Sequence, residues 1–152
     1  MKISISDIKQ LRNQTNAPVM ECKKALEESS GDSKKAKNLL KKWGLVRAKK
    51  KADRETKEGR IFSYLHHSAK IGAMVEIECE TDFVSRNQEF EKLGNEIAMQ
   101  IASMKPKNVK ALLSQEYIRD PKLRVADLVK QAIAKLGENI VVKRFERLEI
   151  GE

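Results

Sequence analysis

The chain has 152 residues and a formal net charge of +9, and it is 40% hydrophobic, 35% charged and 5% aromatic. This length allows one medium domain, or a small domain joined to a larger one, and excludes a paired nucleotide-binding fold or a barrel enzyme. The apolar content is too high and too periodic for a disordered chain, and the apolar runs are too short to span a membrane. Residues 1–4 show neither a signal nor a transit pattern, so we expect a cytoplasmic protein, or at most a mature organellar one.

The positive charge is concentrated in the N-terminal part of the chain. Residues 1–60 hold 17 Lys and Arg against 8 Asp and Glu, a net charge of +9, whereas residues 61–152 sum to zero. A basic surface predicts an anionic partner, which is a nucleic acid or an acidic protein, unless the surface is merely solvated. Single-stranded nucleic acid is bound by stacking on aromatic side chains, and Trp43 is the one aromatic residue in the basic segment.

The sequence contains no recognisable catalytic or metal-binding motif. Cys22 and Cys79 lie too far apart in sequence for a zinc motif or a disulfide framework, so we expect two buried, reduced thiols. His66 and His67 would point to opposite faces of a strand, which makes a poor metal site. Phosphate loops and nucleophile–histidine arrangements are missing as well. We therefore expect a protein that is not an enzyme and that uses no metal or cofactor.

Residues 1–45 are predicted to form three short helices. Ser4 or Ser6 can cap the first helix and Asp32 can cap the third, which we expect Gly44 to end. In each segment the apolar residues recur at the spacing of one helix face. These residues are Ile5, Ile8, Leu11, Val19, Cys22, Ala25, Leu26, Ala36, Leu39, Leu40 and Trp43. A three-helix bundle of this size has a small core and no cavity, which favours a binding module over an enzyme.

Two strands are predicted to open the remaining part of the chain. They span residues 61–66 and 75–80 and are joined by a hairpin turn at residues 68–72. In the second strand, apolar residues alternate with three glutamates, so one face is apolar and the other is acidic.

Two amphipathic helices follow these strands. The first is predicted to begin at a capping box formed by residues 85–88 and to end at Pro106. The second is predicted to end at Gly137, which can adopt the left-handed conformation of a helix C-cap. Residues 105–123, between the two helices, are weakly patterned.

Residues 140–150 predict a third strand, although Arg144 and Glu146 interrupt its apolar alternation. A β-bulge, or an edge partly covered by another chain, would explain the interruption. The order β-β-α-α-β predicts an α+β core with a three-stranded antiparallel sheet and helices on one face.

The loop Thr81–Val84 joins the second strand to a helix start, a type of junction that often holds functional groups on a rigid scaffold. Phe83 either packs into the core like Phe90, or stays exposed as an aromatic wedge for a pocket on a partner. Asp82 either supports the same contact or acts as an additional acid at a helix N-terminus. The residues themselves leave these readings open.

Three ordered blocks of the sequence resemble the bacterial translation elongation factor Ts family, in its short, single-core form. The first block is residues 11–26, continued by Gly31, Asp32 and the alanine/lysine run at 48–52. The second and most specific block is residues 75–87, which read Val-Glu-Ile-Glu-Cys-Glu-Thr-Asp-Phe-Val-Ser-Arg-Asn. The third block is residues 132–145, so that the resemblance covers nearly the whole chain.

The resemblance implies a domain organisation. It predicts a three-helix, ubiquitin-associated-like N-terminal domain at residues 1–45 that binds elongation factor Tu. A charged helical linker would follow at 46–58, and a core domain of the Ts type at 59–152. Short members of the family pair two cores, so the resemblance implies a homodimer.

The resemblance also implies a function, that of a guanine-nucleotide exchange factor. Such a factor binds elongation factor Tu in its GDP-bound and nucleotide-free forms, disturbs the Mg²⁺ and phosphate site, and promotes GDP release during translation elongation. Phe83 would intrude between two helices of Tu. The positions that match the family's contacts are Thr81, Asp82, Phe83 and Val84, for displacement of Mg²⁺ from Tu, and Val19, Met20 and Lys23 in the N-terminal domain.

Two of the sequence's departures from the family pattern concern the first loop and the region after residue 104. Asn16 replaces the usual loop glycine, and asparagine tolerates the left-handed conformation well. The region at 105–112 is shorter than the helical excursion of longer members. With the resemblance, neither a membrane nor a direct nucleic-acid partner is expected; a basic RNA- or ribosome-associated binding module is the alternative function.

Overall fold

The computed structural model describes residues 3–152; Met1 and Lys2, where the predicted N-terminal domain begins, lie outside the described residues. Its elements in chain order are α1 (Ile5–Thr15), α2 (Val19–Glu28), α3 (Ser33–Lys51), β1 (Glu58–Leu65), β2 (Ile71–Cys79), α4 (Asp82–Ser85), α5 (Gln88–Met104), α6 (Val109–Ser114), β3 (Glu116–Tyr117), β4 (Asp120–Arg124), α7 (Val125–Leu136) and β5 (Val141–Glu149).

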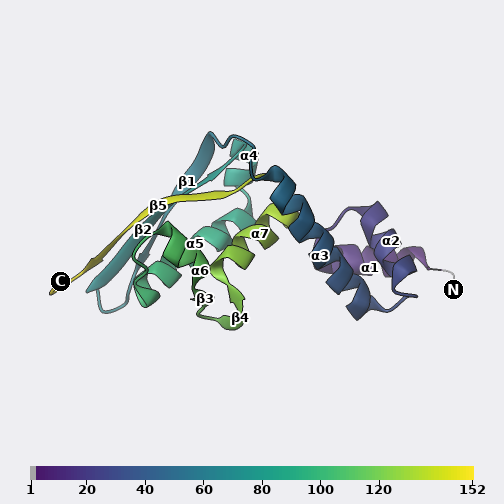
Figure 1. Ribbon diagram of the computed structural model, residues 1–152, viewed down its shortest axis with the longest axis horizontal. Helices are drawn as coiled ribbons and strands as arrows, with labels where there is room; N and C mark the ends of the chain where they lie inside the picture. The colour runs from purple at the N-terminus through teal and green to yellow at the C-terminus, as the bar shows by residue number, and fades with distance from the viewer. Residues whose placement is uncertain (1–2) are drawn as a thin grey trace.

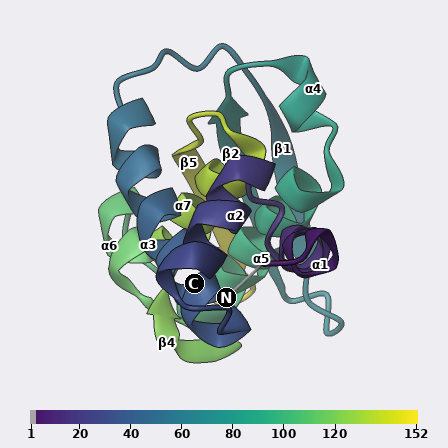
Figure 2. The same ribbon diagram turned by 90° about the vertical axis from the view of Figure 1, so that its right-hand side faces the viewer.

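The molecule is elongated, with the N-terminal helices at one end and a sheet at the other (Figure 1). Strands β1, β2 and β5 form an antiparallel sheet in the order β1-β2-β5. Helices α5 and α7 cover one face of this sheet (Figure 1). The third N-terminal helix, α3, extends from α1 and α2 to the core, where it packs alongside α7. Viewed along the long axis, the N-terminal helices lie in front of the core (Figure 2). The predicted α+β class and the three-stranded antiparallel sheet are confirmed.

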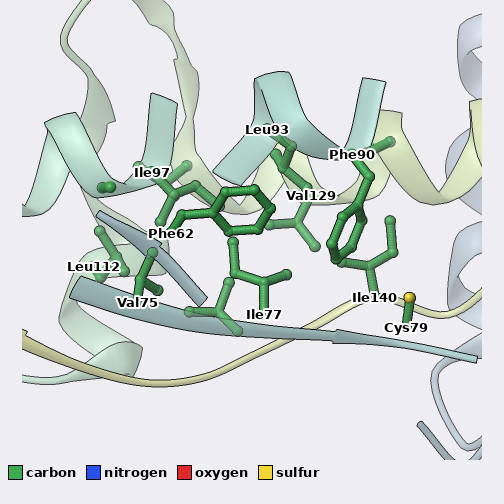
Figure 3. Close-up of a cluster of buried hydrophobic side chains, with 14 of the residues drawn as sticks. Phe62, Val75, Ile77, Cys79, Phe90, Leu93, Ile97, Leu112, Val129 and Ile140 are labelled. Atoms are coloured by element: carbon green, nitrogen blue, oxygen red, sulfur yellow. The ribbon is translucent and has the colours of Figure 1, made fainter. Parts of the chain in front are cut away.

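The main core lies between the inner face of the sheet and helix α5 (Figure 3). Phe62 of β1 packs against Phe90 of α5, with ring centroids 5.6 Å apart. Val75, Ile77 and Cys79 of β2 are buried beneath them, as their alternation with glutamates predicts. Each large apolar side chain contributes about 1.5–3 kcal/mol when it is fully buried, so this interface stabilises the end of the central strand β2, to which the Thr81–Val84 loop is attached.

The N-terminal helices have a small core of their own, centred on Leu11, Cys22 and Leu26. Ser4 caps α1 and Asp32 caps α3 through side-chain bonds to backbone N–H groups, as predicted. Asn16 adopts the left-handed conformation, with φ 53°, so the substituted loop residue keeps the turn. The three predicted helices are therefore confirmed.

Gly44 does not end the third helix, contrary to the prediction. Helix α3 continues through it to Lys51, and Gly44 is buried against α7. A Cβ atom at Gly44 would lie only 2.8 Å from the Cβ of Ala134. The missing side chain allows the two helices to approach closely, so this glycine is a packing residue between the N-terminal helices and the core. Helix α3 crosses residues 45 and 46 unbroken. The domain boundaries at residues 45 and 58 stay a prediction.

The predicted capping box at residues 85–88 is also wrong. Ser85 is buried and donates a hydrogen bond to the carbonyl oxygen of Asp82 (2.8 Å), which completes the short helix α4. Asn87 instead caps α5, where its Oδ1 accepts a hydrogen bond from the backbone N–H of Glu89 (2.8 Å). Two consecutive helices occupy the segment for which one helix start was predicted.

Strand β5 contains the irregularity that its interrupted alternation predicts. Glu76 pairs with Arg144 whereas the next residue, Ile77, pairs with Val142, so that Lys143 is left over as a bulge. The weakly patterned segment 105–123 folds into α6, β3 and β4, which are attached to the core by a buried amide.

That amide belongs to Gln100 of α5, which is 1% exposed. It donates a hydrogen bond to the carbonyl oxygen of Glu116 (3.0 Å) and accepts one from the N–H of Ile118 (3.0 Å).

Within residues 3–152, no helix has both the length and the hydropathy needed to cross a bilayer.

The close approach of α3 and α7 yields a stability prediction. Gly44→Val should lower the free energy of unfolding by about 1–3 kcal/mol, because the branched side chain must displace Ala134. The measurement is urea unfolding followed by circular dichroism. Asn38→Val places the same residue at an exposed position of the same helix and should change stability by less than about 1 kcal/mol. Equal losses in the two variants would contradict the packing role of Gly44.

Candidate protein-binding site

The Thr81–Val84 loop places an aromatic side chain in solvent. Strand β2 ends at Cys79 and α4 begins at Asp82, with Thr81 as its N-cap. Phe83 is 85% exposed, so it does not pack into the core as Phe90 does. Of the two readings that the sequence left open, the exposed aromatic is the one observed.

The geometry of one helical turn explains this exposure. Val84 and Ser85 are 8% and 6% exposed and attach α4 to the core. Successive helical residues are rotated by about 100°, so burying these two turns Phe83 away from the protein. Asp82 lies in the first turn and forms an ion pair with Arg86, with 2.9 Å between Oδ2 and Nη2. The Asp82 carboxylate therefore precedes Phe83 in the same helix and is already paired with the guanidinium group of Arg86.

A carboxylate from a distant loop anchors the start of this turn. Glu138, between α7 and β5, accepts hydrogen bonds from the backbone N–H groups of Glu80 (3.1 Å) and Thr81 (3.0 Å). It also accepts a bond from the hydroxyl of Thr81 (2.6 Å). Sequence reasoning assigned no role to Glu138, since its only signal was an acidic residue after the helix-ending Gly137. A local sequence pattern cannot reveal that Glu138 accepts hydrogen bonds from residues 57 and 58 positions away.

The second predicted surface lies on α2. Met20 is 72% exposed and Val19 is about half exposed, which gives the N-terminal helices a small apolar patch. Lys23 lies one turn further along α2 and pairs with Glu27, with 3.8 Å between the charged atoms. These three residues share a helix but are not brought together with Phe83: α2 and α4 lie in separate parts of the molecule, with α3 between them (Figure 1).

A groove of about 680 Å³ lies between α1, α3 and α7, and its walls contain none of the predicted site residues. Its lining includes Leu40, Lys41, Arg47 and Ala134. Within residues 3–152, no cluster of three or more histidine, cysteine, aspartate and glutamate side chains is arranged to hold a metal ion. Phe83 therefore projects from the surface and does not line an enclosed site for a small ligand.

Both thiols are buried and unpaired. Burial raises the pKa of Cys79 to about 11, and the negative charge of Glu138 adds to this shift. The Cys79 thiol donates a hydrogen bond to the carbonyl oxygen of Thr81 (3.2 Å). A neutral, buried thiol is a poor nucleophile, so Cys79 supports the loop by packing.

Comparison with known proteins identifies the family. A family model described as Elongation factor TS matches residues 80–152, which include the Thr81–Val84 loop and Glu138. The chain is 41% identical to elongation factor Ts of Fervidobacterium nodosum and 42% identical to that of Coprothermobacter proteolyticus, and each alignment covers 100% of both proteins. The chain belongs to the elongation factor Ts family. It is therefore a translation elongation factor.

This chain is a short member of the elongation factor Ts family. The alignments with the two relatives above extend over 197 positions, more than the 152 residues of this chain, so those relatives carry segments that it lacks. Elongation factor Ts of Aquifex aeolicus is 47% identical, and that alignment covers 98% of this chain but 53% of the longer relative. Shared sequence thus extends across both the N-terminal helices and the core.

The raised pKa of Cys79 predicts a pH-dependent stability. In the unfolded chain the thiol has its ordinary pKa of 9.0, and in the folded protein about 11. The protonated thiol is therefore favoured by folding: its contribution is complete below pH 9 and is lost as the pH rises to 11. Urea unfolding should show that the free energy of unfolding of the wild type falls relative to that of Cys79→Ala as the pH rises from 9 to 11. Parallel stability curves would contradict the shift.

Proposed function

We propose that this protein is a guanine-nucleotide exchange factor for elongation factor Tu and that it acts in the cytoplasm. It binds Tu in the GDP-bound state, disturbs the Mg²⁺ and phosphate site, and promotes release of GDP. The factor itself catalyses no covalent step. Membership of the elongation factor Ts family supports the exchange role, and the exposure of Phe83 supports the way in which it is carried out.

The exposed Phe83 is the observation that carries the proposal. A phenylalanine at the surface gains roughly 2 kcal/mol when it enters an apolar pocket. If the pocket exists only between displaced helices of Tu, this gain is made only in the open, nucleotide-releasing state. A ligand shifts a conformational equilibrium by its differential affinity for the two states, so a wedge of this kind favours the state from which GDP leaves.

The loss of Mg²⁺ explains why GDP would follow. Mg²⁺ is bound by a few protein ligands, waters and phosphate oxygens in near-octahedral geometry, and a displacement of those ligands weakens the hold on the diphosphate. In this proposal Asp82, beside the wedge, supports the contact with Tu. Thr81 and Val84 hold the turn from which Phe83 projects.

The α2 surface provides the second contact in the proposal. Val19 and Met20 supply exposed apolar area, and Lys23 supplies a positive charge at its edge. An acidic protein surface is the partner that this combination fits. The α2 surface and the Phe83 turn lie on one connected scaffold. When one of them has bound Tu, the effective concentration of the other near Tu is therefore raised.

We propose a protein partner rather than a nucleic acid for the basic N-terminal segment. Trp43, its one aromatic residue, packs against the helix core, and the ammonium group of Lys24 lies 5.4 Å from the centre of its ring. The ring is therefore not free to stack with bases. An RNA-associated role remains the second candidate because α3 presents exposed lysines on its outer side, such as Lys42 and Lys49; that role requires RNA binding that weakens steeply with salt.

We also propose that two copies pair through the uncovered face of the sheet. Leu65 and Leu148 flank Gly72 across the three strands, and Leu148 is 77% exposed. Met74 of β2 is exposed as well, and the exposed Ile150 directly follows the end of β5. A second copy offers the same face, and a two-fold contact would bury both at once; the pairing implied for short members of the family agrees with this.

The wedge is tested by GDP release. Phe83→Ala should lower the acceleration of GDP release from Tu by a factor of about thirty, which corresponds to roughly 2 kcal/mol of lost contact. The measurement is the release of fluorescently labelled GDP after mixing with a range of factor concentrations. Ile118→Ala truncates another exposed apolar residue, on the β3–β4 connection, and should release GDP at the wild-type rate. A Phe83→Ala protein as fast as the wild type would refute the wedge.

The pairing of two copies is tested by sedimentation equilibrium. Leu148→Glu should convert a dimer into a monomer, because it places a charge within the apolar sheet face. Ile118→Glu adds the same charge away from that face and should leave the dimer intact. A wild-type protein that sediments as a monomer at micromolar concentration would remove this part of the proposal.

A further inference from the structure

We infer that Glu138 is a positioning residue for Phe83, and that its loop also holds the segment leading from the N-terminal helices. This loop, Gly137–Asn139, lies between α7 and β5. The inference rests on the proposed function, in which Phe83 is the residue that contacts Tu. It adds a residue that makes no contact of its own with the partner.

Phe83 has little to hold it except the backbone on which it stands. Its side chain is 85% exposed, so core packing does not fix its direction. The turn is fixed from two sides: Val84 is buried on the C-terminal side, and the three bonds to Glu138 hold Glu80 and Thr81 on the N-terminal side. Removing Glu138 therefore leaves the buried Val84 and Ser85 as the main anchors of the turn.

The carboxylate is well suited to this position. It offers two oxygens to three donors, and bonds to an ionised acceptor are stronger than neutral ones. The hydroxyl of Thr81 lies 2.6 Å from one oxygen of Glu138 and 3.5 Å from the backbone N–H of Val84. The chain of contacts thus runs from Glu138 through Thr81 into the first turn of α4, directly beneath Phe83.

The same loop contacts the segment after α3. The amide of Asn139, which is 3% exposed, donates hydrogen bonds to the carbonyl oxygens of Ala52 (3.3 Å) and Arg54 (2.8 Å). Lys51 donates to the carbonyl oxygen of Gly137 (2.7 Å). Three consecutive residues of the loop therefore bind either the Phe83 turn or the end of the N-terminal helices.

Glu80 closes the connection between the two sides. One of its carboxylate oxygens accepts a hydrogen bond from the backbone N–H of Asn139 (2.7 Å) and lies 3.6 Å from the guanidinium of Arg54. Side chains from the β2 end, the α7–β5 loop and the post-α3 segment thus share one polar cluster. Such a cluster reduces the conformational freedom that Phe83 would lose on binding, and preorganisation of this kind raises affinity without new contacts.

The first test uses the full-length protein without any partner. Amide hydrogen exchange measured by NMR should become about threefold to tenfold faster in Glu138→Ala than in the wild type, both at Thr81 and at Val84. Val84 is decisive, because its N–H makes no bond to Glu138 and responds only if the whole turn loosens. Glu138→Gln keeps one acceptor oxygen and should lie between the two. Unchanged exchange at Val84 would overturn the inference.

The second test is a double-mutant cycle on GDP release from Tu. Glu138→Ala should slow the stimulated release about threefold to tenfold in the wild-type background and should have no further effect in the Phe83→Ala background. A loss of equal size in both backgrounds would show that Glu138 acts on Tu directly or through general stability, and would overturn the positioning role. Glu116→Ala removes an exposed glutamate from β3 and should change neither measurement.

The two tests separate the inference from the proposed function. If the wild-type protein does not accelerate GDP release, the exchange function fails, and amide exchange at Val84 alone decides whether Glu138 holds the turn. If the wild type accelerates release but the Glu138 variants equal it, the exchange function stands and the positioning role is refuted.

Discussion

The single helical turn α4 is held at both ends and thereby fixes the direction of Phe83 at the candidate site. Burial of Val84 and Ser85 attaches α4 to the core, and the three bonds accepted by Glu138 attach the residues just before it. With both ends fixed, the helical rotation leaves only one direction for Phe83, away from the protein. An exposed aromatic side chain is a cost in an isolated protein, and a rigid turn presents it without losing further freedom on binding.

The rest of the fold supports that turn through the sheet and through α3. The packing of Phe62 and Phe90 fixes β1 and β2 against α5, so the end of β2 is a rigid point of attachment. The close approach of α3 to α7 at Gly44 joins the N-terminal helices to the same body. The two surfaces that carry the proposed contacts with Tu thereby lie on one connected scaffold, although they share no residues.

A function of this kind needs shape and charge rather than reactive groups. Both thiols are buried and unpaired, and the carboxylates around the Thr81–Val84 turn accept structural hydrogen bonds or pair with arginines. Differential binding to two states of a partner is sufficient to release a nucleotide. The proposed exchange role would therefore rest on binding and would require no reactive group of this chain.

The sequence by itself predicted the fold class and the elements with strong hydrophobic periodicity, and it singled out Thr81–Val84 as the candidate site. Local spacing was sufficient to predict a residue's environment where that environment depends on its neighbours in sequence. Examples are the alternating burial in β2 and the helix caps at Ser4 and Asp32. It misread Gly44, whose missing side chain serves a helix 90 residues away. Only the tertiary structure decided that Phe83 is exposed and that Glu138 anchors its turn, because each depends on contacts between segments that are distant in the chain.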